Sequence, residues 1–175
     1  LGAEFIPNLD EGDFAVEMRL MPGASLTNTI AKTEQASKVL LENFSEVKKV
    51  VGKIGTAEIP TDPMPMEACD LMIILNDKSQ WKNAESKEDL ADLMKKTLER
   101  NMPGVDFGFQ QPIQMRFNEL MTGAKQDVVV KIYGEEFTML ENYADQIGKQ
   151  ALKIKGVEDL YVEQLEGLPQ LLINY

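Results

Sequence analysis

One pattern recurs three times along the chain: an apolar strand, an amphipathic helix and a second apolar strand. The repeats begin near residues 13, 70 and 127, and each is long enough for a crossover that joins two strands through a helix. Two such units can pair into a four-stranded sheet with both helices on one face, and the third unit is half of such a sandwich. The sequence therefore predicts an α/β (α+β) chain with one ferredoxin-like subdomain and half of a second.

The limits of the predicted elements come from apolar periodicity and from turn and capping residues. Ser25 and Ser86 can cap the first two helices, because their side-chain oxygens can accept hydrogen bonds from first-turn N–H groups. The predicted strands cover residues 14–20, 47–54, 69–75, 105–109, 127–133, 157–162 and 168–175. The core-facing residues predicted for the three helices are Leu26, Ile30, Leu40 and Phe44; Leu90, Leu93, Met94 and Leu98; and Leu140, Ala144, Ile147, Ala151 and Ile154.

The charge and composition of the chain exclude several classes of protein. Its 18 basic and 29 acidic residues give a formal net charge of −11, so we expect it to repel nucleic acid and anionic lipid. It has no histidine and a single cysteine, Cys69, which excludes an internal disulfide, a Cys-rich zinc site and an ordinary serine or cysteine triad. We therefore expect no enzyme. The acidic surface fits simple solubility as well as attraction of cations, and any bound metal must use carboxylates, carbonyls, methionine sulfur or that thiol.

The chain is expected to be a piece of a larger protein. It begins at Leu1 without a charged and then apolar leader, and no apolar run approaches the roughly 20 residues that cross a bilayer. The third strand–helix–strand unit lacks partner strands, which leaves a sheet edge or an apolar face uncovered. If the parent protein lies in a membrane, we expect this part to stand outside it.

Two segments have unusual chemistry. Residues 55–70 combine four carboxylates, two methionines and Cys69 with three prolines that hold the backbone extended. This composition fits either a metal-facing loop or a solvated acidic connector. Residues 111–125 join the second and third repeats, and their apolar residues and Arg116 are unusual for a surface linker. A buried arginine needs a carboxylate partner, so we expect Arg116 to pair with an Asp or Glu of another element, as a structural ion pair or in direct function.

Four longer stretches carry a specific resemblance. They are residues 1–13 (LGAEFIPNLDEGD); 55–58 (GTAE) with 61–65 (TDPMP); 111–120 (QPIQMRFNEL) with 122–123 (TG); and 156–157 (GV) with 162–169 (VEQLEGLP). These stretches resemble the heavy-metal efflux branch of the resistance-nodulation-division (RND) transporters, of the cobalt-zinc-cadmium type. The resemblance covers essentially the whole chain. It implies the start of the second large periplasmic loop of a trimeric, proton-driven inner-membrane pump of a Gram-negative bacterium. Such a pump works with a periplasmic adaptor and an outer-membrane channel.

The same resemblance implies a division of the chain into four parts. Residues 1–12 would be a linker that follows a transmembrane helix. Residues 13–110 would form one porter subdomain, residues 111–124 a connector lining the substrate cleft, and residues 125–175 the first half of the next porter subdomain. The membrane would be reached only through transmembrane parts outside this chain.

Candidate metal ligands also follow from the resemblance. The copper/silver branch carries three cleft methionines, whose positions fall at Glu17, Ala68 and Glu119 here. Carboxylates suit Zn²⁺, Co²⁺ or Cd²⁺ better than Cu⁺, which thioethers select. The predicted metal ligands are Glu17, Asp70 and Glu119, with Asp62 and Glu67 as secondary ligands and Met64, Met66, Met115 and Met121 as weak ones. Arg116 and Lys125 are expected to balance the charge of the cleft, as partners of Asp62 and Asp70.

The predicted function is therefore that of a porter fragment that binds divalent cations and passes them toward an outer-membrane channel. The metal would be cargo, with no catalytic residue and no permanently bound cofactor. The alternative is a structural or interaction module, which makes trimer and adaptor contacts and has no metal site of its own. A drug-exporting relative is disfavoured, because its cleft should be richer in aromatic residues than a chain with 7% of them.

Overall fold

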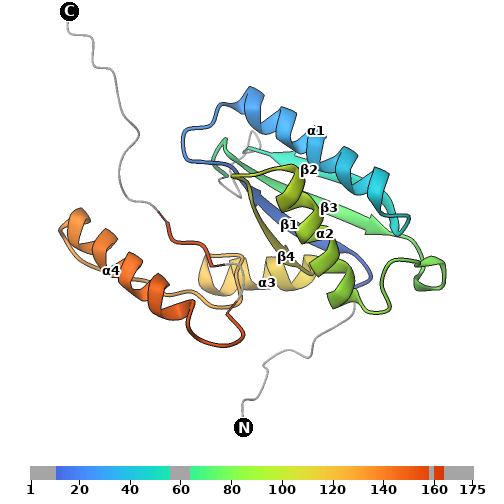
Figure 1. Cartoon of the computed structure of the whole chain (residues 1–175). Helices are drawn as coiled ribbons and strands as arrows, with labels where there is room; N and C mark the ends of the chain where they lie inside the picture. The colour runs from blue at the N-terminus through green and yellow to red at the C-terminus, as the bar shows by residue number, and fades with distance from the viewer. Residues whose placement is uncertain (1–10, 56–63, 158–159, 164–175) are drawn as a thin grey trace, which may run out of the picture. The chain divides into compact units, whose positions relative to one another are not determined.

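The structure is a computed structural model and describes residues 11–55, 64–157 and 160–163. The chain divides into two compact units, Leu1–Gln126 and Asp127–Tyr175 (Figure 1). The first unit contains β1 (Phe14–Arg19), α1 (Leu26–Asn43), β2 (Val47–Ile54), β3 (Ala68–Leu75), a short 3₁₀ helix (Lys78–Gln80), α2 (Lys87–Asn101), β4 (Asp106–Gln110) and α3 (Pro112–Thr122). The second unit contains α4 (Phe137–Ala151).

The first unit is built on one four-stranded sheet with the order β2-β3-β1-β4. Every neighbouring pair of strands is antiparallel. Since β3 lies between β1 and β2, each strand–helix–strand unit crosses over one strand of the other, and both helices lie on the same face. This is the ferredoxin-like arrangement, so the predicted fold class is confirmed.

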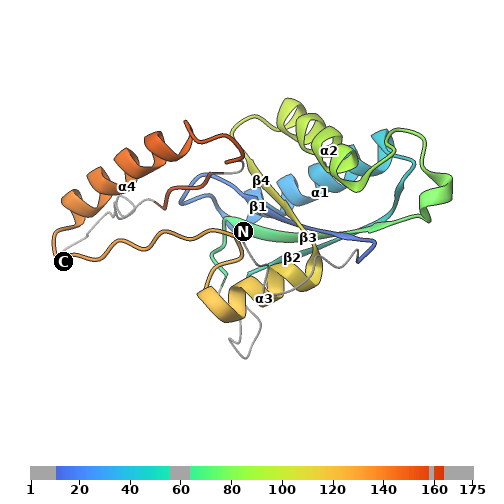
Figure 2. The ribbon, with the colours of Figure 1, turned by 90° about the horizontal axis from the view of Figure 1, so that it is seen from below.

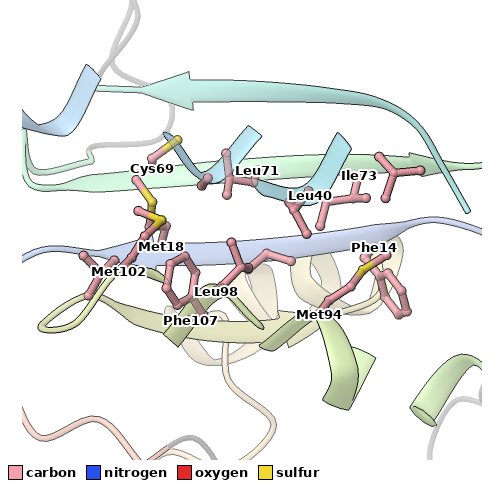
Figure 3. Packing of buried hydrophobic residues seen from close by; sticks show 14 of the residues in the cluster. Phe14, Met18, Leu40, Cys69, Leu71, Ile73, Met94, Leu98, Met102 and Phe107 are labelled. Atoms are coloured by element: carbon pink, nitrogen blue, oxygen red, sulfur yellow. The ribbon is translucent and has the colours of Figure 1, made fainter. Parts of the chain in front are cut away.

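The core lies between this sheet and the helices α1 and α2. In β1 and β3 every second side chain faces the helices, as the period of a strand requires. Figure 3 shows Leu71 and Ile73 of β3 near Leu40 of α1, with Phe14 and Met18 of β1 in the same cluster. Both predicted caps are present: the Ser25 hydroxyl accepts from Asn28 N–H at 3.3 Å, and the Ser86 hydroxyl accepts from Asp89 N–H at 3.0 Å.

The buried face of α1 differs from the predicted one. Leu40 is buried as expected, but Leu26 and Ile30 are exposed, and Thr29, Thr33 and Ala36 take the core positions. The threonines can be buried because their hydroxyls are satisfied. Thr29 donates to the Met66 carbonyl at 2.6 Å, and Thr33 donates to the Thr29 carbonyl at 2.8 Å. In α2 the prediction fails at one position, because Leu93 is exposed.

In the part of the second unit that the structure describes, the strands predicted for residues 127–133 and 157–162 are not formed. Residues 127–133 form no ladder with any described segment, and Val128 and Tyr133 are more than 80% exposed. Strand backbone groups need a neighbouring strand, and the described part of this unit offers none. Residues 157 and 160–162 are likewise not in a strand, and residues 168–175 lie outside the described ranges. Two residues of the predicted helical stripe are exposed: Ile147 on α4, and Ile154, which lies beyond the end of that helix.

A close approach between α1 and the sheet depends on Gly52 of β2. A Cβ at Gly52 would lie 2.5 Å from Cγ2 of Thr33 and 3.4 Å from Sγ of Cys69. Thr33 is buried and hydrogen-bonded, so its side chain cannot move aside to make space for the added Cβ. We expect Gly52→Ala to lower the free energy of unfolding by about 1–3 kcal/mol, as overpacked cores do.

Chemical denaturation measures this effect, with Gly108→Ala in β4 as the matched control. A Cβ at Gly108 would meet no atom within 4 Å. Equal stability losses in the two variants would contradict the close approach of α1 to β2.

Candidate functional site

The candidate site lies on the sheet face that α1 and α2 leave uncovered. Here Glu17 of β1 and Asp70 of β3 are direct cross-strand partners in the antiparallel register. Both are buried, with 9% of Glu17 and 6% of Asp70 exposed. Helix α3 contacts β1 and lies on this side of the sheet, opposite α1 and α2 (Figure 2). The fold therefore brings together two carboxylates that are more than fifty residues apart in the sequence.

Two like charges directly opposite each other destabilise a sheet unless something compensates them. Glu17 Oε1 accepts from Arg19 Nη2 at 2.8 Å, and Glu17 Oε2 accepts from Gln126 Nε2 at 2.8 Å. Asp70 holds the Lys125 ammonium with both oxygens, at 2.7 and 2.8 Å. The expected pairing of Lys125 with Asp70 is thus present. The site combines two buried acids with two cations and one amide.

Among the described residues, Arg116 pairs within its own helix. It lies on α3, is largely exposed, and pairs with Glu119 one turn later on the same helix. Its expected partner Asp62 lies outside the described residues, so that pairing stays a prediction. Residues three apart on a helix are neighbours, and an exposed guanidinium needs no more distant partner. The Glu119 carboxylate is engaged by its own helix.

The remaining predicted ligands that the structure describes do not gather around this pair. Within the described ranges, no group of three or more His, Cys, Asp or Glu side chains is arranged to hold a metal ion, so Glu119 does not join Glu17 and Asp70. Glu67 precedes β3, where its carbonyl accepts from Leu20 N–H at 2.9 Å, and Asp62 lies outside the described residues. Met64 is buried, whereas Met66 and Met121 are exposed. The metal site itself stays a prediction.

Cys69 is adjacent to Asp70 in sequence but does not belong to this site. Its side chain lies in the core on the helix-facing side of the sheet. Burial raises the pKa of the Cys69 thiol, and a hydrogen bond with Thr33 only partly offsets that effect. The thiol therefore stays protonated near neutral pH and is a poor metal ligand there.

Three residues of this region were missed by sequence reasoning. Arg19 shares the face of Glu17, and the period-two alternation of β1 was a usable signal for it. Gln126 gave no signal, because its approach to Glu17 depends on how the chain leaves α3. Glu11 caps α3: its carboxylate accepts from Ile113 N–H at 2.6 Å and from Gln114 N–H at 3.2 Å. Only the position of α3 on the sheet reveals that role.

Comparison with known proteins decides the family. A model of the AcrB/AcrD/AcrF family matches residues 1–175. The chain belongs to this family. Over 99% of its length, the chain is 43% identical to Protein HelA of Legionella pneumophila. Over the same share of its length, it is 38% identical to the cobalt-zinc-cadmium resistance protein CzcA of Cupriavidus metallidurans. It spans 16% of the length of each of these relatives.

A solved structure supports the same conclusion. The X-ray structure of a heavy metal efflux pump matches the structure of this chain with a TM-score of 0.86 and a sequence identity of 30%. The match covers 95% of this chain and 17% of the pump chain. The resemblance to the heavy-metal efflux branch of the RND transporters is confirmed, as is the mixed α/β fold with its antiparallel sheet. In the described part of the chain, no helix combines the length and the hydrophobicity needed to cross a bilayer.

Proposed function

We propose that the chain is a porter fragment of a heavy-metal cation efflux pump, and that Glu17 and Asp70 form the centre of its divalent-cation site. The observation that carries the proposal is the buried cross-strand pairing of these two carboxylates. Two ionised carboxylates on directly opposite residues of neighbouring strands repel each other, and a divalent cation relieves the repulsion by binding both. Oxygen ligands favour Zn²⁺, Co²⁺ or Cd²⁺ over a monovalent soft ion.

The proposal includes the setting of the whole protein. The chain would belong to the periplasmic part of a proton-driven, trimeric inner-membrane pump that works with an adaptor and an outer-membrane channel. The names of two relatives, the cobalt-zinc-cadmium resistance protein CzcA and the cation efflux system protein CusA, support a metal cation as the cargo. Two carboxylates alone leave a divalent ion incompletely coordinated. We therefore propose the predicted ligands Glu119 and Asp62 as further ligands of the bound ion, although Glu119 is paired with Arg116 in this structure and does not join Glu17 and Asp70 here.

Zinc titration of the chain tests the site. The double variant Glu17→Gln/Asp70→Asn keeps the shapes of both side chains and removes both charges. We expect it to bind Zn²⁺ at least about tenfold more weakly than the unmodified chain, because losing even a residue that supports a ligand costs 10–100-fold. Isothermal titration calorimetry measures the affinities.

The matched control is Glu42→Gln/Asp92→Asn, which removes two exposed carboxylates and therefore the same net charge. This control should retain the affinity of the unmodified chain. If the two double variants lose affinity equally, the acidic surface attracts zinc without a specific site. If neither variant changes zinc binding, the structural alternative takes the place of the cargo-site proposal.

A further inference from the structure

Helix α3 is held on the sheet by polar contacts at its two ends. None of its residues is buried, and Ile113, Leu120 and Met121 are exposed, so apolar packing contributes little to its position. At its first end, Glu11 accepts from two backbone N–H groups of the helix. Gln111 completes a reciprocal contact there, because its Oε1 accepts from Glu11 N–H at 3.0 Å. We call these contacts the first clasp.

The second clasp lies at the far end of α3 and consists of Lys125 on Asp70 and Gln126 on Glu17. Asn118 of α3 joins it to the helix, since its Nδ2 donates to the Lys125 carbonyl at 3.2 Å. The Lys125 side chain is only 13% exposed, although lysine is seldom buried. Its ammonium therefore occupies the site as a cation fixed to the chain.

The two clasps respond differently to an added cation. The first clasp places a carboxylate on the positive end of a helix dipole, and it does not involve the carboxylates of the candidate site. The second clasp uses the same oxygens that a metal ion would need: both oxygens of Asp70 and Oε2 of Glu17. A divalent ion on those oxygens would also repel an ammonium held within a few ångströms, most strongly where water is scarce.

We infer that Lys125 is a tethered competitor of the cargo, so that a divalent cation binds Glu17 and Asp70 only as the Lys125 ammonium leaves and the second clasp opens. This inference rests on the proposed function and adds its regulation. Exchange of one cation for another keeps the buried acids compensated in both states. Binding of the cation and release of the far end of α3 from the sheet are then coupled and occur together.

Zinc titration of Lys125→Met tests the competition. Methionine keeps much of the side-chain volume and removes the competing charge. We expect this variant to bind Zn²⁺ on the order of tenfold more tightly than the unmodified chain, within the 5- to 150-fold range of typical couplings. Lys96→Met on α2 removes the same charge from an exposed position and should leave zinc affinity unchanged. Lys125→Arg retains a cation and should bind zinc no more tightly than the unmodified chain.

Hydrogen exchange of residues 112–126 gives the second readout. In the unmodified chain, zinc should accelerate amide exchange there as the clasp opens. In Lys125→Met, exchange should already be fast without zinc and change little on its addition. This readout also shows whether the variant is folded, since β1 and β3 should stay protected in each protein.

The outcomes separate the two proposals. Equal or weaker zinc binding by Lys125→Met, in a protein whose zinc affinity falls in Glu17→Gln/Asp70→Asn, overturns the competition and leaves the cargo site standing. Unchanged exchange of residues 112–126 on zinc binding likewise overturns the opening of the clasp. If neither the unmodified chain nor Lys125→Met binds zinc, both the site and its competitor are refuted.

Discussion

Glu46→Gln is expected to lower the free energy of unfolding of the first unit by about 1.5–3 kcal/mol at neutral pH, the range for hydrogen bonds to charged groups. Glu46 is fully buried between α1 and β2. Its Oε1 accepts from Lys82 N–H and Asn83 N–H, both at 2.7 Å, and its Oε2 accepts from Asn83 Nδ2 at 2.9 Å. Glutamine would replace one acceptor oxygen with a donor that faces the donating amide of Asn83.

The pH dependence of this loss follows from the pKa of Glu46. Burial opposes ionisation, but the N–H groups of Lys82, Asn83 and Glu46 itself, with the Asn83 side chain, hold the pKa below its usual value of 4.5. The Glu46 carboxylate is therefore protonated less readily in the folded state than in the unfolded state. The stabilisation is complete above the unfolded pKa and is lost as pH falls through the folded pKa.

Urea denaturation at neutral pH and in the acid range below 4.5 measures the difference between the wild-type chain and Glu46→Gln. The difference should be largest at neutral pH and should shrink in acid. Glu42→Gln is the control, because Glu42 is exposed and makes only a 3.8 Å ion pair with Lys38. That variant should change stability by less than about 0.5 kcal/mol at either pH. A pH-independent loss in Glu46→Gln would contradict the charged acceptor.

The regular part of the fold was predictable because two strong patterns agree there. Alternating side chains of β1 and the apolar run of β3 identify central strands, and the two serine caps fix where the helices begin. The phase of α1 was not predictable from hydrophobicity. Thr29 and Thr33 enter the core because the Met66 carbonyl and the preceding turn of the helix satisfy their hydroxyls. Hydropathy treats threonine as a surface residue and cannot anticipate partners supplied by the rest of the fold.

The candidate site was predictable in part. The resemblance pointed to Glu17 and Asp70, and the register of β1 with β3 places them side by side. The contacts of Lys125 and Gln126 depend on where α3 lies, which no local pattern encodes. Residues 112–122 were predicted only as a connector, although Pro112 near the start of the helix and Gly123 with a φ of 75° at its end are helix boundary signals. The strands predicted for residues 127–133 and 157–162 fail for a different reason, since the described residues of the second unit offer them no pairing partner.

A second large effect is expected in α2, where one leucine is buried and another is exposed on the same helix. Leu98 is fully buried, and Figure 3 shows it in the cluster that holds Met18, Leu40 and Phe107. Leu98→Ala should lower the free energy of unfolding by about 2–5 kcal/mol, because it removes apolar contacts and leaves a cavity. Leu93 was predicted to share this core face but is 40% exposed.

Leu93→Ala therefore serves as the matched control, with the same atoms removed from the same helix. It should cost less than about 1 kcal/mol, since surface substitutions away from special features change stability little. Guanidinium denaturation of both variants measures the contrast, and an unchanged dependence on denaturant would show that each still unfolds from the same compact state. Equal losses would mean that α2 presents a different face to the sheet, which would also displace β4 and the start of α3 that follow it in the chain.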